Sequence, residues 1–182
     1  MKKGLLLLLL IFILPFATIA QENKYFNSGK MVATAGVGLS GLGLGYGVGF
    51  EYGITDNIGV FPAFITHSYE SGIQSWSFNA FDIWGTYHSK SISSWFGNSD
   101  KVDAYYMGGV TIVSFGVESG IAKEETSSSF GFGVGAGGRY HFSDKLAAYG
   151  EGRYRFASFK TDSYSLAIAW YSLNVGVSYA IN

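Results

Sequence analysis

The sequence predicts an all-β fold: an eight-stranded antiparallel up-and-down transmembrane β-barrel, preceded by a cleavable signal peptide. Three observations predict it. Segments of about ten residues alternate between apolar side chains and glycine or charged ones, which is the period of a strand and not of a helix. The chain is 48% hydrophobic and 18% aromatic but only 14% charged, whereas about 25% charge is usual for soluble domains. It also has 26 glycines, two prolines and no cysteine, so disulfides cannot stabilise it.

The beginning of the chain has the pattern of a secretory signal peptide. Lys2 and Lys3 precede an apolar run from Leu5 to Leu14, and small residues precede a cleavage site after Ala20. The apolar run has about half of the ~20 residues that a helix needs to span a bilayer, which disfavours a membrane-anchoring helix. We therefore expect a signal peptide over residues 1–20.

A single barrel domain is expected over residues 21–182. Without the two lysines of the signal peptide, the domain carries ten Lys and Arg against thirteen Asp and Glu. This slightly acidic balance indicates no nucleic-acid partner. Neither a disulfide framework nor a thiolate metal site is possible without cysteine.

Eight segments have the alternating pattern. In chain order they are Met31–Ser40, Leu44–Ile54, Ile58–Thr66, Phe81–Ser89, Ala104–Gly116, Phe130–Phe142, Leu146–Ala157 and Tyr171–Ile181. Most have about the 9–11 residues that a tilted membrane strand requires. Eight strands make the smallest common closed barrel, and both ends of the chain then lie on the same side.

The sixth segment shows the two faces most clearly. Phe130, Phe132 and Val134 lie on one face, whereas glycines, Arg139 and His141 lie on the other. Such a sheet suits a wall between lipid and a narrow polar interior. The outward set expected on three other strands is Leu44, Tyr46, Val48, Phe50, Tyr52, Ile54, Phe81, Ile83, Tyr87, Leu173, Val175, Val177, Tyr179 and Ile181. A soluble barrel with the apolar face inside is disfavoured, because glycine and a few charges would be its entire solvated surface.

Two similar segments indicate tight turns at the periplasmic side. Residues 52–58 match residues 140–146, and each has Thr or Ser, then Asp, then Asn or Lys between two apolar strands. Asp and Asn favour such turns by hydrogen-bonding to their own backbone. The longer connections, which contain Ser68–Ser77, Glu118–Ser129 and Ser158–Ser163, are then expected to face outward.

Two segments depart from this simple pattern. Lys90–Val102 is a long connection on the expected periplasmic side, and a short helical piece with Trp95 and Phe96 at the interface is one interpretation. Pro62 lies inside the third strand, where it cannot donate a ladder hydrogen bond, so we expect a bulge there.

Side-chain parity also predicts a polar network inside the barrel. Its expected members are Glu51, Asp82, His88, Arg139, His141, Glu151, Arg153 and Arg155. Unpaired charges in so narrow a space are very costly, so the three arginines are expected to pair with the three carboxylates. Two interpretations remain: a static plug of ion pairs, or a gated polar path along which Arg and Glu exchange partners. An eight-stranded interior is just filled by side chains, which favours the plug.

The chain resembles the small outer-membrane β-barrel proteins of the OmpA/OmpX type over residues 31–182. The last strand, Asn174–Ile181, looks like the assembly signal that such barrels present to the outer-membrane insertion machinery, although Ile181 and Asn182 stand where a terminal aromatic residue is common. The resemblance implies residence in the bacterial outer membrane, contact with its lipids, and a monomer. It implies neither a cofactor nor a metal.

Three functions are open from the sequence. The leading hypothesis is a non-enzymatic barrel with a structural or surface-interaction role, contacting a ligand through outer loops that contain Tyr69, Trp76, Glu124 and Glu125. The second is a narrow passive pore for small solutes. The third is a lipid A-modifying enzyme, because His141-Phe142-Ser143 has the His-x-Ser spacing of the lipid A deacylase barrels, with Glu151 downstream. A turn serine beside an interior histidine is the favoured explanation of that spacing, because the two residues flank a tight turn and Glu151 lies higher along an adjacent strand.

Overall fold

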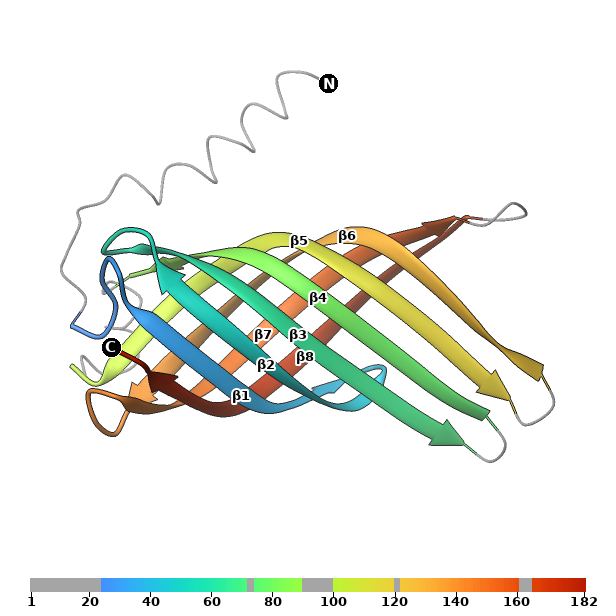
Figure 1. Cartoon of the computed structure of the whole chain (residues 1–182), viewed down its shortest axis with the longest axis horizontal. Helices are drawn as coiled ribbons and strands as arrows, with labels where there is room; N and C mark the ends of the chain where they lie inside the picture. Colours follow the sequence, from blue (N-terminus) through green and yellow to red (C-terminus); the bar gives the residue numbers. More distant parts are fainter. Residues whose placement is uncertain (1–23, 72–73, 90–99, 120–121, 161–164) are drawn as a thin grey trace, which may run out of the picture.

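A computed structural model describes residues 24–71, 74–89, 100–119, 122–160 and 165–182. Eight antiparallel strands close into one barrel in the order β1 to β8, with β1 paired to β8 (Figure 1). The strands are β1 Met31–Ser40, β2 Gly43–Gly53, β3 Ile58–Ser71, β4 Gln74–His88, β5 Val102–Ser119, β6 Ala122–His141, β7 Leu146–Lys160 and β8 Ser165–Ala180. The predicted fold is confirmed.

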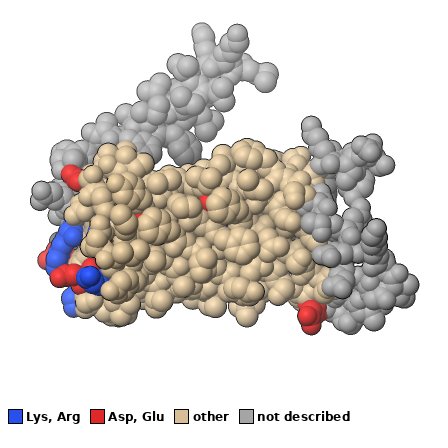
Figure 2. All heavy atoms as spheres, in the orientation of Figure 1, with Lys and Arg blue, Asp and Glu red and all other residues tan. Residues whose placement is uncertain are grey.

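The outer wall of the barrel is apolar. Of the side chains expected to face outward, all but the half-buried Tyr87 are exposed, and Leu44, Val48, Leu173 and Val175 are each about 60% exposed. Figure 2 shows that charged residues gather at one end of the molecule, while the wall between the ends shows almost none. Lipid-facing strands require this distribution, because charge on that face is destabilising in hydrocarbon. Among the described residues no helix is long and apolar enough to cross a bilayer.

The barrel has two dissimilar ends. At the turn end, defined by the short turns 54–57 and 142–145, lie the start of β1 and the end of β8. At the opposite hairpin end, the β3–β4, β5–β6 and β7–β8 hairpins extend beyond the short β1–β2 connection (Figure 1). The β1–β2 connection is a tight turn, and Gly43 adopts a φ of 97° that favours glycine.

The strands at the hairpin end are longer than the sequence pattern predicts. Residues 68–71 and 74–77 pair with each other as parts of β3 and β4, and much of the expected loops 118–129 and 158–163 is likewise strand. The interpretation of these segments as loops is therefore wrong for most of their length. Serines and charged residues replace the apolar alternation in these segments, so the sequence pattern does not mark them as strands. Their backbones can still pair, because a ladder outside the lipid does not depend on an apolar face.

The turns at the turn end repeat each other, as their matching sequences predict, but a hydroxyl and not the Asp stabilises them. Thr55 Oγ1 accepts hydrogen bonds from the amides of Asn57 (3.3 Å) and Ile58 (3.0 Å). Ser143 Oγ accepts from the amides of Lys145 (3.3 Å) and Leu146 (3.1 Å). Each hydroxyl thus satisfies two amides that the strands leave free.

Replacing Thr55 by alanine is expected to lower the free energy of unfolding by about 0.5–1.5 kcal/mol, because two turn amides lose their acceptor. Urea unfolding of the protein in phospholipid vesicles measures the loss. Thr55→Ser keeps the hydroxyl and should retain the stability of the parent chain. Equal stability of the alanine and serine variants would show that the hydroxyl contributes nothing.

Pro62 does not produce the expected bulge. The β2–β3 pairing stops after Gly49–Ala63 and resumes at Tyr52–Val60 in the same register. The ladder to β4 is unbroken. Pro62 therefore leaves a gap in one ladder, because it has no amide to donate, without inserting a residue.

Two predictions fall outside the described residues. They are the signal peptide over residues 1–20 and the helical piece containing Trp95 and Phe96. The side chains of Glu124 and Glu125 are also outside the description, although their backbones belong to β6.

Candidate functional site

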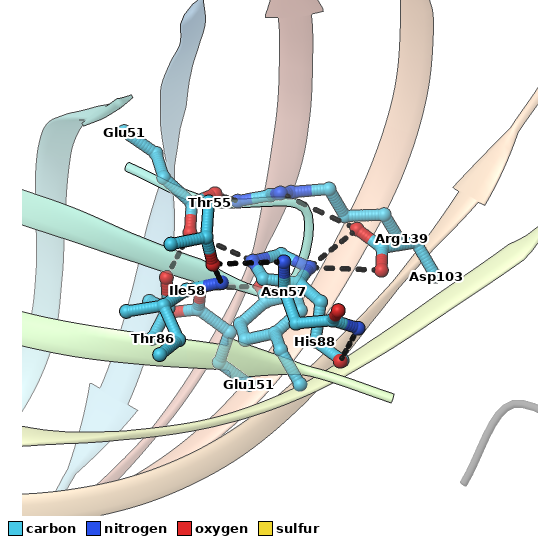
Figure 3. Close-up of polar contacts among 10 residues, drawn as sticks. Glu51, Thr55, Asn57, Ile58, Thr86, His88, Asp103, Arg139 and Glu151 are labelled. Carbon is cyan, nitrogen blue, oxygen red and sulfur yellow. Dashed lines mark hydrogen bonds and ion pairs between the residues drawn. The ribbon is translucent and has the colours of Figure 1, made fainter. Parts of the chain in front are cut away.

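The barrel interior brings most of the predicted polar residues together, in two clusters. The first lies near the turn end (Figure 3). His88, the last residue of β4, lies between two carboxylates: its Nδ1 is 2.9 Å from Asp103 Oδ1 and its Nε2 is 2.9 Å from Glu51 Oε1. Arg139 bridges the same two carboxylates, at 2.5 Å from Glu51 and 3.5 Å from Asp103. Thr86 donates a further hydrogen bond to Glu51 at 2.5 Å.

Both ring nitrogens of His88 face carboxylate oxygens. A neutral imidazole has one donor and one acceptor nitrogen, whereas the imidazolium has two donors. His88 therefore serves as a cation in this arrangement. The turn-end cluster then contains two cations, His88 and Arg139, and two anions, Glu51 and Asp103, all nearly inaccessible to solvent.

The second cluster lies near the middle of the barrel and is built around Asp82. Arg155 donates to both oxygens of Asp82, at 3.2 and 2.6 Å, and Arg153 donates to Asp82 Oδ2 at 3.2 Å. Arg153 also holds Glu151 with two bonds of 2.8 and 2.5 Å. The Tyr105 hydroxyl donates to Glu151 at 2.7 Å. Two-bond Arg–carboxylate pairs fix orientation as well as charge.

The two clusters together balance their charges. The carboxylates are Glu51, Asp82, Asp103 and Glu151, and the cations are His88, Arg139, Arg153 and Arg155. Each group has an oppositely charged partner within hydrogen-bond distance or close to it. Buried charges persist in proteins only with such compensation, since removing one partner leaves an uncompensated charge.

An apolar layer follows toward the hairpin end. Its buried members are Ile65, Phe78, Ala80, Val113, Ala157, Phe159 and Trp170. The rings of Phe78 and Trp170 meet edge to face with centroids 4.7 Å apart. Leu42, from the β1–β2 connection, packs against the layer. A layer of hydrocarbon thus lies on one side of the ion pairs.

The wall of β1 and β2 explains how so many large side chains fit. Its inward positions include Gly36, Gly38, Gly45, Gly47 and Gly49, and a side chain at each would collide with interior side chains or with the backbone of the neighbouring strands. A cavity of about 20 Å³ remains beside this wall, lined in part by Thr34, Tyr149 and Asn174. That volume holds about one water molecule.

Of the eight residues predicted for the network, seven lie in the two clusters and His141 lies apart. His141 is buried at the turn end and stacks against Tyr25, with ring centroids 3.8 Å apart and planes 8° from parallel. The described residues show no ion pair for it.

Three residues at the turn end were not predicted. Asp103 precedes the start assigned to the fifth strand, yet it continues that strand's inward series, so extending the alternation by one residue would have found it. Tyr25 and Phe26 precede the first strand, and no periodic signal marks them. Phe26 is completely buried and stacks on His88 with ring centroids 3.5 Å apart.

The structure does not assemble the His141, Ser143 and Glu151 arrangement of the enzyme hypothesis. The Ser143 hydroxyl accepts two amides of its own turn. Glu151 is held by Arg153 and Tyr105. His141 is covered by Tyr25. A nucleophile requires its base within hydrogen-bond reach and a third group that orients the base, and these contacts engage all three residues elsewhere.

Comparison with solved structures finds the same fold. Neisserial surface protein A superimposes with a TM-score of 0.61 and 16% identity, covering 82% of this chain and 94% of that one. A major outer membrane protein from Thermus thermophilus superimposes with a TM-score of 0.59 and 14% identity, covering 84% of this chain and 98% of that one. Ail, the attachment invasion locus protein of Yersinia pestis, superimposes with a TM-score of 0.51 and 15% identity, covering 84% of this chain and 99% of that one.

Comparisons of sequence alone find no match, either to a protein-family model or to a curated protein. At 14–16% identity the solved structures establish the fold and nothing finer. That fold is the one shared by small outer-membrane β-barrels, as the resemblance of the sequence implied.

Proposed function

We propose that this chain is an integral protein of the bacterial outer membrane with a closed interior, and that it acts through its hairpin end. The observation that carries the proposal is the filling of the barrel by two successive layers, the balanced ion pairs and the apolar cluster. A solute would have to displace both layers. Its outer-membrane location is supported by the apolar wall and by the outer-membrane relatives of the fold.

The hairpin end offers the contact surface. Tyr69 on β3 and Trp76 on β4 are opposite each other in the ladder, and their side chains are 54% and 39% exposed. Phe115 on β5 supports Trp76, with ring centroids 5.3 Å apart. Exposed aromatic side chains on a rigid ladder supply large contact areas at low entropic cost. A surface protein and an attachment protein share this fold, which favours a surface-interaction role.

The pore hypothesis is tested by planar-bilayer recording of the purified protein. We expect no steady conductance from the parent chain. We also expect none after Glu151→Gln, because this change leaves the apolar layer of Phe78 and Trp170 in place. Stable current steps from the parent chain, altered by the Glu151 substitution, would overturn the closed interior and support the passive pore.

The enzyme hypothesis has a separate test. Mass spectrometry of lipid A from cells with and without the protein should give identical acylation patterns. Ser143→Ala provides the matched variant, because it removes the only hydroxyl of the His-x-Ser segment. A change in acylation that requires Ser143 would replace the surface-interaction proposal with a catalytic one.

A further inference from the structure

The segment before β1 fills the mouth of the barrel at the turn end. Phe26 lies flat on His88, with planes 7° from parallel, and Tyr25 lies flat on His141. Phe26 is fully buried and Tyr25 is 8% exposed. Neither residue belongs to a barrel strand, so the closure of the sheet does not explain their burial.

A turn at Asn27–Lys30 anchors this segment to the barrel. The amide of Gly29, which has a φ of 80°, donates to Gly53 O at 2.8 Å, and the amide of Lys30 donates to Asn27 O at 3.1 Å. Ser28 contributes two more bonds, from its amide to Asp56 Oδ1 (3.1 Å) and from its hydroxyl to Ile54 O (3.2 Å). The segment is therefore held on the turn between β2 and β3.

Asn182 ties the same turn to the seam of the barrel. Its Oδ1 accepts from the amide of Met31 at 2.8 Å, and its Nδ2 donates to Gly29 O at 2.8 Å. One side chain after β8 thus holds both the first residue of β1 and the turn before it. Because β1 and β8 pair only when the barrel closes, this latch forms only in the closed barrel.

The mouth is shaped to receive the aromatic ring. A Cβ added at Gly53 would meet Asn27 O and lie 3.4 Å from the Phe26 ring. One at Gly59 would lie 2.6 Å from Thr86 Oγ1 and 2.9 Å from the same ring. Any other residue at these two positions would therefore crowd the segment. Gly53 is a feature of the barrel wall that is independent of the stacking, and its contact with Asn27 O indicates the same docking position.

We propose that residues 24–30 form a stopper, in which Phe26 fills the mouth of the barrel and Asn182 is the latch that holds the segment in place. Docking of the stopper controls access of water to the turn-end cluster around His88. The contacts are one stacked pair of rings at each histidine and a small number of hydrogen bonds. Such a segment opens locally at a lower free energy than the barrel unfolds. Opening exposes His88, Glu51, Asp103 and Arg139 to solvent at the turn end.

Thiol labelling tests the stopper. The chain has no cysteine, so a Thr86→Cys reporter, placed beside Glu51 and beneath Phe26, is the sole thiol. In the folded protein in detergent micelles we expect a charged methanethiosulfonate to react very slowly with it. Adding Phe26→Ala should accelerate the reaction about tenfold or more, because the frequency of local opening sets the labelling rate. Adding Asn182→Ala should accelerate it to a smaller extent.

Phe142→Ala is the matched control, because Phe142 lies at the same end but faces outward and is 61% exposed. It should leave the labelling rate unchanged. Gel mobility before and after heating must show that every variant is folded. Equal labelling rates for Phe26→Ala and the parent reporter would overturn the stopper, and an unchanged rate in Asn182→Ala would remove the latch. Neither result bears on conductance, which the apolar layer blocks separately.

Discussion

Replacing Asp82 by alanine is expected to lower the free energy of unfolding by about 3–5 kcal/mol, because it leaves buried cations without their carboxylate. Arg155 donates to Asp82 through Nε and Nη2, and its Nη1 donates to Ser172 Oγ. Arg153 retains Glu151. The loss therefore falls mainly on Arg155, whose side chain is completely buried. The loss of free energy is measured by urea unfolding in phospholipid vesicles, with the folded fraction read from the shift in gel mobility on heating.

Two matched variants make this prediction specific. Asp144→Ala removes a carboxylate that is 87% exposed at the turn end and should leave the unfolding transition unchanged. Asp82→Ala combined with Arg155→Met removes the charge together with its partner, and it should be less destabilising than Asp82→Ala alone. If the double variant were the less stable of the two, the ion pair would not be the source of the effect.

The architecture of the barrel could be predicted from the sequence because lipid and a narrow interior impose opposite demands on alternate residues. The clearest case is β6, where phenylalanine alternates with glycine and both faces are unambiguous. The same rule placed Glu51, Asp82 and Arg139 inside without any knowledge of the fold. It failed at the hairpin end, where the strands leave the lipid and segments such as 68–71 and 74–77 pair without an apolar face.

The candidate site could be predicted only in part, because parity shows which way a side chain faces but not what it meets. It gave the cations and most carboxylates of the interior, but not the separation of the ion pairs from the apolar layer around Trp170. That separation depends on the register between strands distant in sequence. Phe26 could not be found at all, since it contributes to no strand and its partner His88 lies 62 positions later in the sequence.

Replacing Val175 by arginine is expected to lower the free energy of unfolding in lipid by about 2–4 kcal/mol, because it places a charge near the middle of the hydrocarbon. Val175 faces outward on β8 and is 58% exposed. It lies midway between Tyr171 and Tyr179, which are outward-facing tyrosines of the kind that mark the two interfaces. The measurement is again urea unfolding in phospholipid vesicles.

Ile181→Arg is the control, because Ile181 follows the same strand, is 48% exposed and lies beyond Tyr179 toward the turn end. An arginine near the interface should cost only about 0–1 kcal/mol, since its charge reaches water. The contrast between the two variants separates lipid contact from any general intolerance of arginine on β8. Equal losses at both positions would mean that this wall does not face hydrocarbon, and the assignment of the apolar side chains to the lipid would then be wrong.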